Sequence, residues 1–253
     1  VIQREKPFVI WGTGKPGQEV TVSIQGKTGR VHILPDGTWK AVLPALHTSD
    51  EELLSISTED ESLTFQKVAV GEVWLAGGQS NMEFHMRYDA DKASELSDCK
   101  NANIRFFDFP EISYPEQLTD FDYSRFGYWR TCDEENLEYF SAVGYYFAKR
   151  LQNELTIPVG IIGCNYGGSP SCAWLSEETV QKTGPVWLEE FKNGLAGIDI
   201  ESYKKEFRSN PMNDRSDPFS DPFGEMMLYP TTREFQLELM SRAPADYGGT
   251  KGP

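Results

Sequence analysis

The chain has 253 residues, of which 39% are hydrophobic and 25% charged, and its formal net charge is -15. This length can bury a sizeable core, in one large domain or two smaller ones, and the composition is typical of a soluble globular protein. The net charge argues against nucleic-acid and membrane-surface partners, because both need clustered Lys and Arg. No uninterrupted apolar stretch is as long as a transmembrane helix. The sequence fits a protein of the bacterial cytoplasm or one that is secreted after removal of a leader.

Residues 1–70 predict a small antiparallel β module, interpreted as a partial sandwich. Apolar and polar residues alternate in short segments, and Asp36-Gly37 has the sequence of a tight hairpin turn. The expected strands cover residues 19–24, 30–34, 38–43, 53–57 and 63–70.

A possible cofactor motif lies inside this module. Residues 12–17 (GTGKPG) match the G-x-G-x-x-G dinucleotide fingerprint and follow a strand-like segment. The fingerprint requires a helix next, because the amino terminus of that helix binds the pyrophosphate. Here Pro16 and the β-patterned residues 19–22 follow instead, so we reject the cofactor interpretation.

From residue 71 onward the pattern changes to alternating strands and helices. Such alternation predicts parallel βαβ units in an α/β domain with a doubly wound, flavodoxin-like sheet, which we place at residues 71–253. The expected strands cover residues 73–76, 104–109 and 158–163. One helix is expected to begin in residues 82–88. A second is expected at 141–154, where apolar residues recur every four positions. Further helices are expected at 186–195, 198–207 and 232–240. Residues 210–230 are rich in Pro, Asp and Ser and are either an ordered insertion or a lid.

The strongest functional signal is the junction between the apolar strand 73–76 and residues 77–81 (GGQSN). A buried strand that leads into a Gly-rich turn ending in serine is how α/β enzymes present a nucleophile at the carboxyl edge of the sheet. The turn differs from the G-x-S-x-G elbow, since Met82 stands at the last position. The alternative is that Ser80 only caps the next helix.

The wider stretch 71–83 (GEVWLAGGQSNME) resembles the serine block of the SGNH hydrolases, in the branch of sialate O-acetylesterases and related carbohydrate acetylesterases. A second block of that branch is recognised at 158–169 (PVGIIGCNYGGS), followed by Ala173-Trp174. The resemblance covers most of residues 1–176. It implies an SGNH-type hydrolase domain that removes acetyl groups from sialic acid or acetylated polysaccharide through an acetyl-enzyme, without a metal or organic cofactor.

The same resemblance assigns roles to residues of the two blocks. Ser80 matches the nucleophile, and its backbone N–H the first oxyanion donor. Gly168, or less directly Gly167, matches the glycine whose N–H is the second donor. The residues expected to line the substrate site are Gln79, Asn165, Tyr166 and Trp174, for each of which ordinary packing is the alternative.

The base histidine of the family, in an Asp-x-x-His segment near the carboxyl end, has no match. The chain has three histidines, His32, His47 and His85, and none has an aspartate three residues before it. His85, five residues past Ser80, is expected to point away from the hydroxyl. We therefore expect the amino-terminal portion of an esterase, completed by a downstream fragment or chain. The alternative is a non-catalytic carbohydrate-binding protein with a hydrolase fold.

The four cysteines are interpreted as small buried thiols. They form no C-x-x-C pair and are too sparse for a disulfide scaffold or a zinc site. They are Cys99, Cys132, Cys164 and Cys172.

Overall fold

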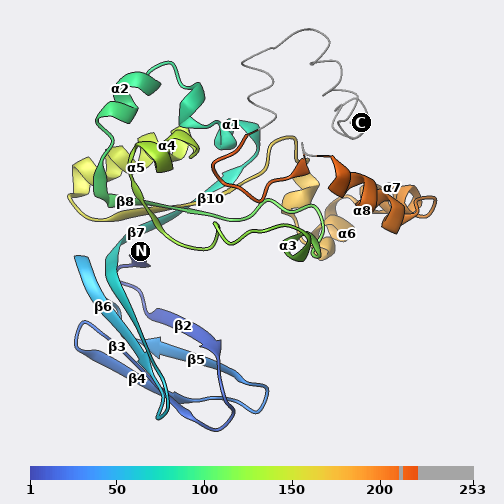
Figure 1. Ribbon diagram of the computed structural model, residues 1–253. Helices are drawn as coiled ribbons and strands as arrows, with labels where there is room; N and C mark the ends of the chain where they lie inside the picture. Colours follow the sequence, from blue (N-terminus) through green and yellow to red (C-terminus); the bar gives the residue numbers. More distant parts are fainter. Residues whose placement is uncertain (211–212, 222–253) are drawn as a thin grey trace. The chain divides into compact units, whose positions relative to one another are not determined.

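The computed structural model describes residues 1–210 and 213–221 (Figure 1). Contacts group the chain into two units. The first unit comprises Val1–Ala76, Phe84–Phe107 and Tyr128–Gly163. The second comprises Gly77–Glu83, Asp108–Gly127 and the described residues from Cys164 onward. The domain boundary expected at residue 70 stays a prediction.

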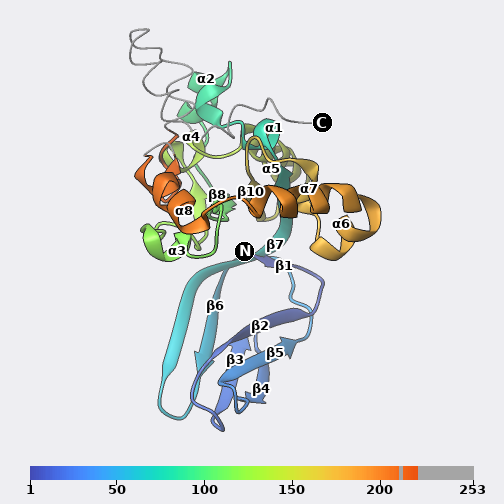
Figure 2. The same ribbon diagram turned by 90° about the vertical axis from the view of Figure 1, so that its right-hand side faces the viewer.

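The β module of the first unit is built from two antiparallel sheets. β3, β4, β6 and the first part of β7 form ladders in one sheet, and β2 pairs with β5 in the other. The module is also seen in the turned view of Figure 2. Its strands are β1 (Ile2–Gln3), β2 (Phe8–Thr13), β3 (Glu19–Ile24), β4 (Lys27–His32), β5 (Thr38–Leu43) and β6 (Ser49–Ser57). The antiparallel β structure expected here is confirmed, and the rejected dinucleotide motif leads from β2 into β3, as expected.

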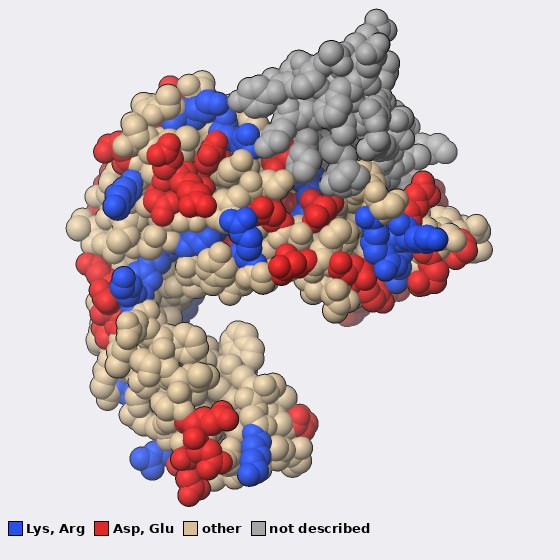
Figure 3. Space-filling model, in the orientation of Figure 1, with Lys and Arg blue, Asp and Glu red and all other residues tan. Residues whose placement is uncertain are grey.

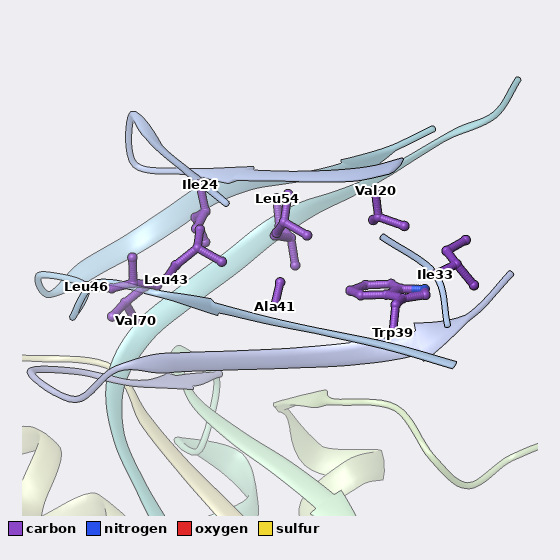
Figure 4. Close-up of a cluster of buried hydrophobic side chains, with 10 residues drawn as sticks. Val20, Ile24, Ile33, Trp39, Ala41, Leu43, Leu46, Leu54 and Val70 are labelled. Atoms are coloured by element: carbon purple, nitrogen blue, oxygen red, sulfur yellow. The ribbon is translucent and has the colours of Figure 1, made fainter. Parts of the chain in front are cut away.

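The core of the module lies between its two sheets (Figure 4). Every second residue of β3 and of β5 is buried, which is the period of a strand with one face on a core. The buried residues are Val20, Val22 and Ile24 from β3, and Trp39, Ala41 and Leu43 from β5.

The turn at Asp36-Gly37 does not form the expected hairpin. Its local geometry is that of a tight turn: Gly37 has φ 84°, and the N–H of Leu34 donates to the carbonyl of Thr38 at 2.8 Å. The strands on either side, however, belong to different sheets, because β5 pairs with β2 and not with β4. The turn therefore carries the chain from one sheet of the module to the other.

β7 (Ser62–Gly78) is one continuous strand of 17 residues, where the sequence predicts two separate strands. The backbone stays hydrogen-bonded across the expected break, since β1 pairs with Val70 and Gly71, and the N–H of Glu72 donates to the carbonyl of Pro158 at 2.9 Å. Gly71 permits this close approach, because a Cβ there would overlap Pro158. The strand thus leads from the β module directly to the serine turn.

The second half of β7 continues into a largely parallel sheet, in the order β7-β10-β8-β9. Helices α2 (Lys92–Ser97), α4 (Glu134–Glu138) and α5 (Ala142–Leu155) lie over one face of it (Figure 1). The α/β fold class is therefore confirmed. The other strands are β8 (Asn101–Asp108), β9 (Arg130–Cys132) and β10 (Val159–Asn165).

α5 confirms the long helix expected after residue 141. The Ser141 hydroxyl caps its start by accepting from the N–H of Gly144 at 3.0 Å. The buried face, however, carries Tyr145 and Ala148, whereas Phe147, in the apolar row that predicted the helix, is 43% exposed. Phe147 packs edge-on against Trp74 instead.

The helix expected to begin in residues 82–88 is interrupted. α1 (Ser80–Glu83) has four residues, and a 3-10 turn, η1 (Met86–Tyr88), follows. Between them His85 forms a β-bridge with Ser141, and the N–H of Met86 donates to the carbonyl of Phe140. Pairing with this distant segment stops the helix.

The second unit contains short helices: α3 (Gln117–Asp120), η2 (Ser171–Trp174), α6 (Glu177–Thr183), α7 (Pro185–Leu195) and α8 (Ile200–Ser209). The helices expected at 186–195 and 198–207 are confirmed as α7 and α8. The helix expected at 232–240, and parts of the 210–230 segment, lie outside the described residues. Among the helices that the structure describes, none is long and apolar enough to cross a membrane.

The surface matches the acidic composition. Asp and Glu side chains are spread over the face drawn in Figure 3, with Lys and Arg between them. All four cysteines are free thiols. Cys99 and Cys132 are buried as expected, while Cys164 and Cys172 are only half-buried, which corrects the expectation for these two.

Candidate active site

The serine turn closes directly after β7. The carbonyl of Gln79 accepts the N–H of Met82 at 2.8 Å and that of Glu83 at 2.9 Å, which forms the single turn of α1. Ser80 and Gln79 are both exposed. The first N–H groups of a helix have no acceptor within it, so the backbone N–H of Ser80 can donate to a ligand.

The second block lies against this turn. The N–H of Tyr166, the first residue after β10, donates to the carbonyl of Gly78 at 3.1 Å. Gly77 is similarly close to the strand end, since a Cβ there would lie 3.7 Å from the carbonyl oxygen of Cys164. The structure therefore brings together the two segments that carry the resemblance. Residues 165–169 are called the second-block loop below.

Hydrogen bonds within the second unit hold this loop in shape. The Ser169 hydroxyl donates to the carbonyl of Tyr166 at 2.7 Å and accepts from Nε1 of Trp174 at 2.9 Å. The Tyr166 hydroxyl lies 3.3 Å from the hydroxyl of Ser113. Tyr166 and Trp174 thus belong to one network, in which Trp174 remains 43% exposed. Asn165, half-buried, ends β10.

A side chain at either of the two loop glycines would have a different consequence. Gly168 has φ 77°, a left-handed conformation that costs other residues free energy, but a Cβ there would meet nothing within 4 Å. At Gly167 a Cβ would overlap Oε2 of Glu83 and lie 3.3 Å from its Cδ, so the end of this side chain would have to move. Glu83 is the last residue of α1, so the loop and the serine helix are in contact.

A group of charged side chains belongs to the same unit. Burial raises the pKa of Glu111 to about 8, the charge of Glu83 acts in the same direction, and Arg215 opposes it. Nε of Arg215 lies 3.8 Å from Oε2 of Glu111, and its Nη1 lies 4.0 Å from Oδ1 of Asp221. The sequence analysis did not identify these residues. Of these residues, only Glu83 lies in a segment that the sequence analysis singled out, as the last residue of the serine block.

This pKa has a consequence for stability. Between the ordinary value of 4.5 and about 8, the unfolded chain ionises Glu111 while the folded protein keeps it protonated. The native state then binds the additional proton, so the free energy of unfolding falls as pH rises through this interval. Glu111→Gln stays neutral at every pH. We expect the variant to gain several degrees in melting temperature, relative to the unsubstituted protein, when pH is raised from 5 to 8.

Thermal unfolding followed by circular dichroism at several pH values would measure this gain. Glu61→Gln is the matched control, because it makes the same substitution at an exposed position of the β module. Equal pH dependence in the Glu111→Gln variant and the unsubstituted protein would contradict the assigned pKa.

The three histidines all belong to the first unit, whereas Ser80 belongs to the second. His32 is exposed on β4, and His47 is exposed in the loop that follows β5. The ring of His85 stacks on Tyr88 at a centroid distance of 6.0 Å and packs against Tyr139 at 6.3 Å. Within the first unit, His85 is thus part of an aromatic group.

Comparison with known proteins identifies relatives. No family model matches the chain. It is 30% identical over 200 residues to the sialate O-acetylesterase of Mus musculus and 31% identical over 202 residues to that of Homo sapiens. A solved structure, a carbohydrate acetylesterase from Xanthomonas citri, superposes with a TM-score of 0.65 at 33% identity.

The matches cover most of this chain but a minor part of each relative. They include 73% of the chain and 37% and 38% of the two curated relatives, and 71% of the chain and 40% of the solved structure. The chain thus spans less than half the length of the proteins it matches. Over this part, it belongs to the SGNH hydrolase family of sialate O-acetylesterases and related carbohydrate acetylesterases.

Proposed function

We propose that this chain supplies the nucleophile and oxyanion donors of a serine carbohydrate O-acetylesterase, which removes acetyl groups from sialic acid or from acetylated polysaccharide. One observation carries the proposal: the second-block loop is hydrogen-bonded to the serine turn through Tyr166 and Gly78. The nucleophile and the oxyanion donor of the family resemblance then lie on adjoining segments. The relatives, a sialate O-acetylesterase and a carbohydrate acetylesterase, suggest the acetylated carbohydrate as substrate.

The proposed reaction has two steps. The Ser80 oxygen attacks the acetyl carbonyl carbon and loses its proton to a base, and the N–H groups of Ser80 and Gly168 donate to the oxyanion. The tetrahedral intermediate expels the sugar oxygen, which takes the proton from the base, and leaves an acetyl-enzyme. Water, deprotonated by the same base, then attacks this ester, the bond to the Ser80 oxygen breaks, that oxygen takes the proton from the base, and acetic acid leaves and ionises to acetate.

The base is proposed to be a histidine outside residues 1–253, carried by a partner segment with the Asp-x-x-His pattern. The reason is that none of the three histidines of the chain has an aspartate three residues before it. His85 packs against Tyr88 and Tyr139, and its backbone forms the bridge with Ser141. A catalytic base must instead reach the serine hydroxyl within hydrogen-bond distance.

Gln79 and Trp174 are proposed to contact the sugar. Gln79 is exposed in the serine turn, and Trp174 is exposed beside the second-block loop. An indole face packs well on a pyranose ring. Tyr166 and Asn165 are half-buried members of the second-block loop, and they are proposed to shape the same site. Trp174→Ala is expected to raise KM for an acetylated oligosaccharide while kcat is retained.

Gly168→Ala tests the oxyanion role. The added methyl group meets no neighbour, but φ 77° is strained for alanine, so the backbone and its N–H are expected to move. Displacing one oxyanion donor should lower kcat for p-nitrophenyl acetate by roughly 10²-fold. The assay uses the chain together with the polypeptide that supplies the base.

Gly17→Ala is the matched control, because Gly17 in the β module has φ 85° and equally open space around a Cβ. Both variants should lose about 1–2 kcal/mol of unfolding free energy, which appears as a similar fall in melting temperature. Only Gly168→Ala should lose activity. If both variants keep full kcat, Gly168 is not the oxyanion donor.

A further inference from the structure

We propose that Glu83 is a positioning residue: its carboxylate fills the space beside Gly167 and thereby sets how closely the second-block loop approaches the serine turn. The proposal rests on the proposed function of Ser80 and Gly168. It adds a residue to which the family resemblance assigns no role.

The backbone of Glu83 is tied to the serine turn. Glu83 is three residues past Ser80, at the end of α1, and its N–H donates to the carbonyl of Gln79 at 2.9 Å. Because α1 has a single turn, a displacement of Glu83 is transmitted to Ser80 over a very short stretch of chain. The starting point of the Glu83 side chain is therefore fixed relative to the nucleophile.

The side chain of Glu83 reaches the loop at Gly167. A Cβ on Gly167 would overlap Oε2 and lie 3.3 Å from Cδ, so the carboxylate occupies the volume that any other residue at this position would need. Oε2 is buried, and no hydrogen-bond donor among the described residues satisfies it. A buried oxygen without a donor is unfavourable for folding, so this arrangement has a cost in stability.

The loop is consequently held on two sides. Tyr166 is hydrogen-bonded to Gly78, and Gly167, the next residue, rests on Glu83. Gly168, whose N–H is the proposed donor, follows immediately. A shift of Gly167 toward a shortened side chain would move this N–H, and a misplacement of about 1 Å can cost 10²-fold in rate.

The position requires a side chain of this length and shape more than it requires a charge. A carboxylate close to the oxyanion would oppose the negative charge that develops in the transition state, so its charge offers no catalytic benefit. Glutamine has almost the same shape and is neutral. Aspartate is shorter by one methylene group and leaves a gap beside Gly167.

Kinetics of four variants test the proposal: Glu83→Gln, Glu83→Asp, Gly167→Ala and the double variant Glu83→Asp/Gly167→Ala. Each is assayed on p-nitrophenyl acetate with the polypeptide that supplies the base, and kcat is normalised to the burst of p-nitrophenol that counts acylated sites. We expect Glu83→Asp and Gly167→Ala to lower kcat roughly 10–10²-fold with KM little changed. Glu83→Gln should retain most of kcat.

The double variant gives the sharpest result. The gap left by aspartate accommodates the methyl group added by Gly167→Ala only if the two side chains share one space, so the kcat of the double variant should exceed the value predicted by multiplying the two single effects. The Glu83 series remains informative even if Gly167→Ala fails to fold. A wild-type kcat in Glu83→Asp, or a loss in Glu83→Gln equal to that in Glu83→Asp, would overturn the proposal. An unsubstituted protein that does not acylate would instead overturn the proposed function, and this proposal with it.

Discussion

Ser80→Ala is expected to lower kcat for acetyl esters by roughly 10⁴–10⁶-fold, the loss seen when a hydrolase loses its nucleophile. The structure gives the reason. Ser80 is exposed at the start of α1, directly after β7, and its turn adjoins the second-block loop. Removing the hydroxyl leaves the oxyanion donors in place, so a residual rate above that of water should remain.

Melting temperature separates this effect from misfolding. The hydroxyl is exposed, and Ser80 makes no side-chain hydrogen bond within the described part of the chain, so Ser80→Ala should unfold within about 2 °C of the unsubstituted protein. Ser171→Ala, at an exposed serine in η2 of the same unit, is the matched control and should keep full activity. A Ser80→Ala variant that keeps its rate would end the hydrolase interpretation of this turn.

Residues 1–253 assayed alone are expected to show no Ser80-dependent turnover, because no histidine of the chain is assigned as the base. Addition of a polypeptide that carries the Asp-x-x-His segment should restore activity. The base acts in its neutral form, so the restored rate should fall as pH drops through the histidine pKa, near 6.5 if that pKa is unperturbed.

One titration measures both the activity of the chain alone and the activity restored by the base-carrying polypeptide. The purified chain, verified by intact mass, is mixed with increasing amounts of the base-carrying polypeptide, and p-nitrophenyl acetate hydrolysis is recorded at each ratio. Turnover should rise to a plateau at a defined stoichiometry. Substantial turnover by residues 1–253 alone would contradict the assignment of the base, and His85→Ala would then be the variant to assay.

Local sequence patterns, together with the resemblance to the SGNH hydrolases, singled out the serine turn and the second-block loop. Each segment follows a strand of the largely parallel sheet, and the carboxyl ends of such strands meet at one edge. The hydrogen bond from Tyr166 to Gly78 agrees with that expectation. The roles of Gly168, Gln79 and Trp174 remain predictions, because their assignment depends on a bound substrate.

The three wrong predictions of secondary structure share one physical cause, which is pairing between distant segments. The Asp36-Gly37 turn formed as its residues require, but β5 then paired with β2 across about thirty residues. β7 continued through Gly71 because β1 and Pro158 supplied partners for its backbone. The helix after Ser80 stopped because His85 bridged to Ser141. Local propensity identifies strands and turns, but it does not select their partners.

The burial of Glu111 and the contact of Glu83 with Gly167 could not be predicted from the sequence for a related reason. A glutamate in a sequence is most often a solvated surface residue, and nothing near Glu111 in the sequence suggests burial. Its raised pKa depends on segments that fold over it, including Arg215 about a hundred residues later. The contact of Glu83 with Gly167 likewise joins residues far apart in the chain.

The most direct test of the proposed mechanism is to identify the acylated residue. The chain, completed by the base-carrying polypeptide, is mixed with p-nitrophenyl acetate, quenched in acid within the burst phase, digested and mapped by mass spectrometry. The mechanism predicts the mass of one acetyl group on the peptide that contains Ser80, and no such mass in the Ser80→Ala variant. Hydrolysis that proceeds while the acetyl group appears on another residue would contradict it.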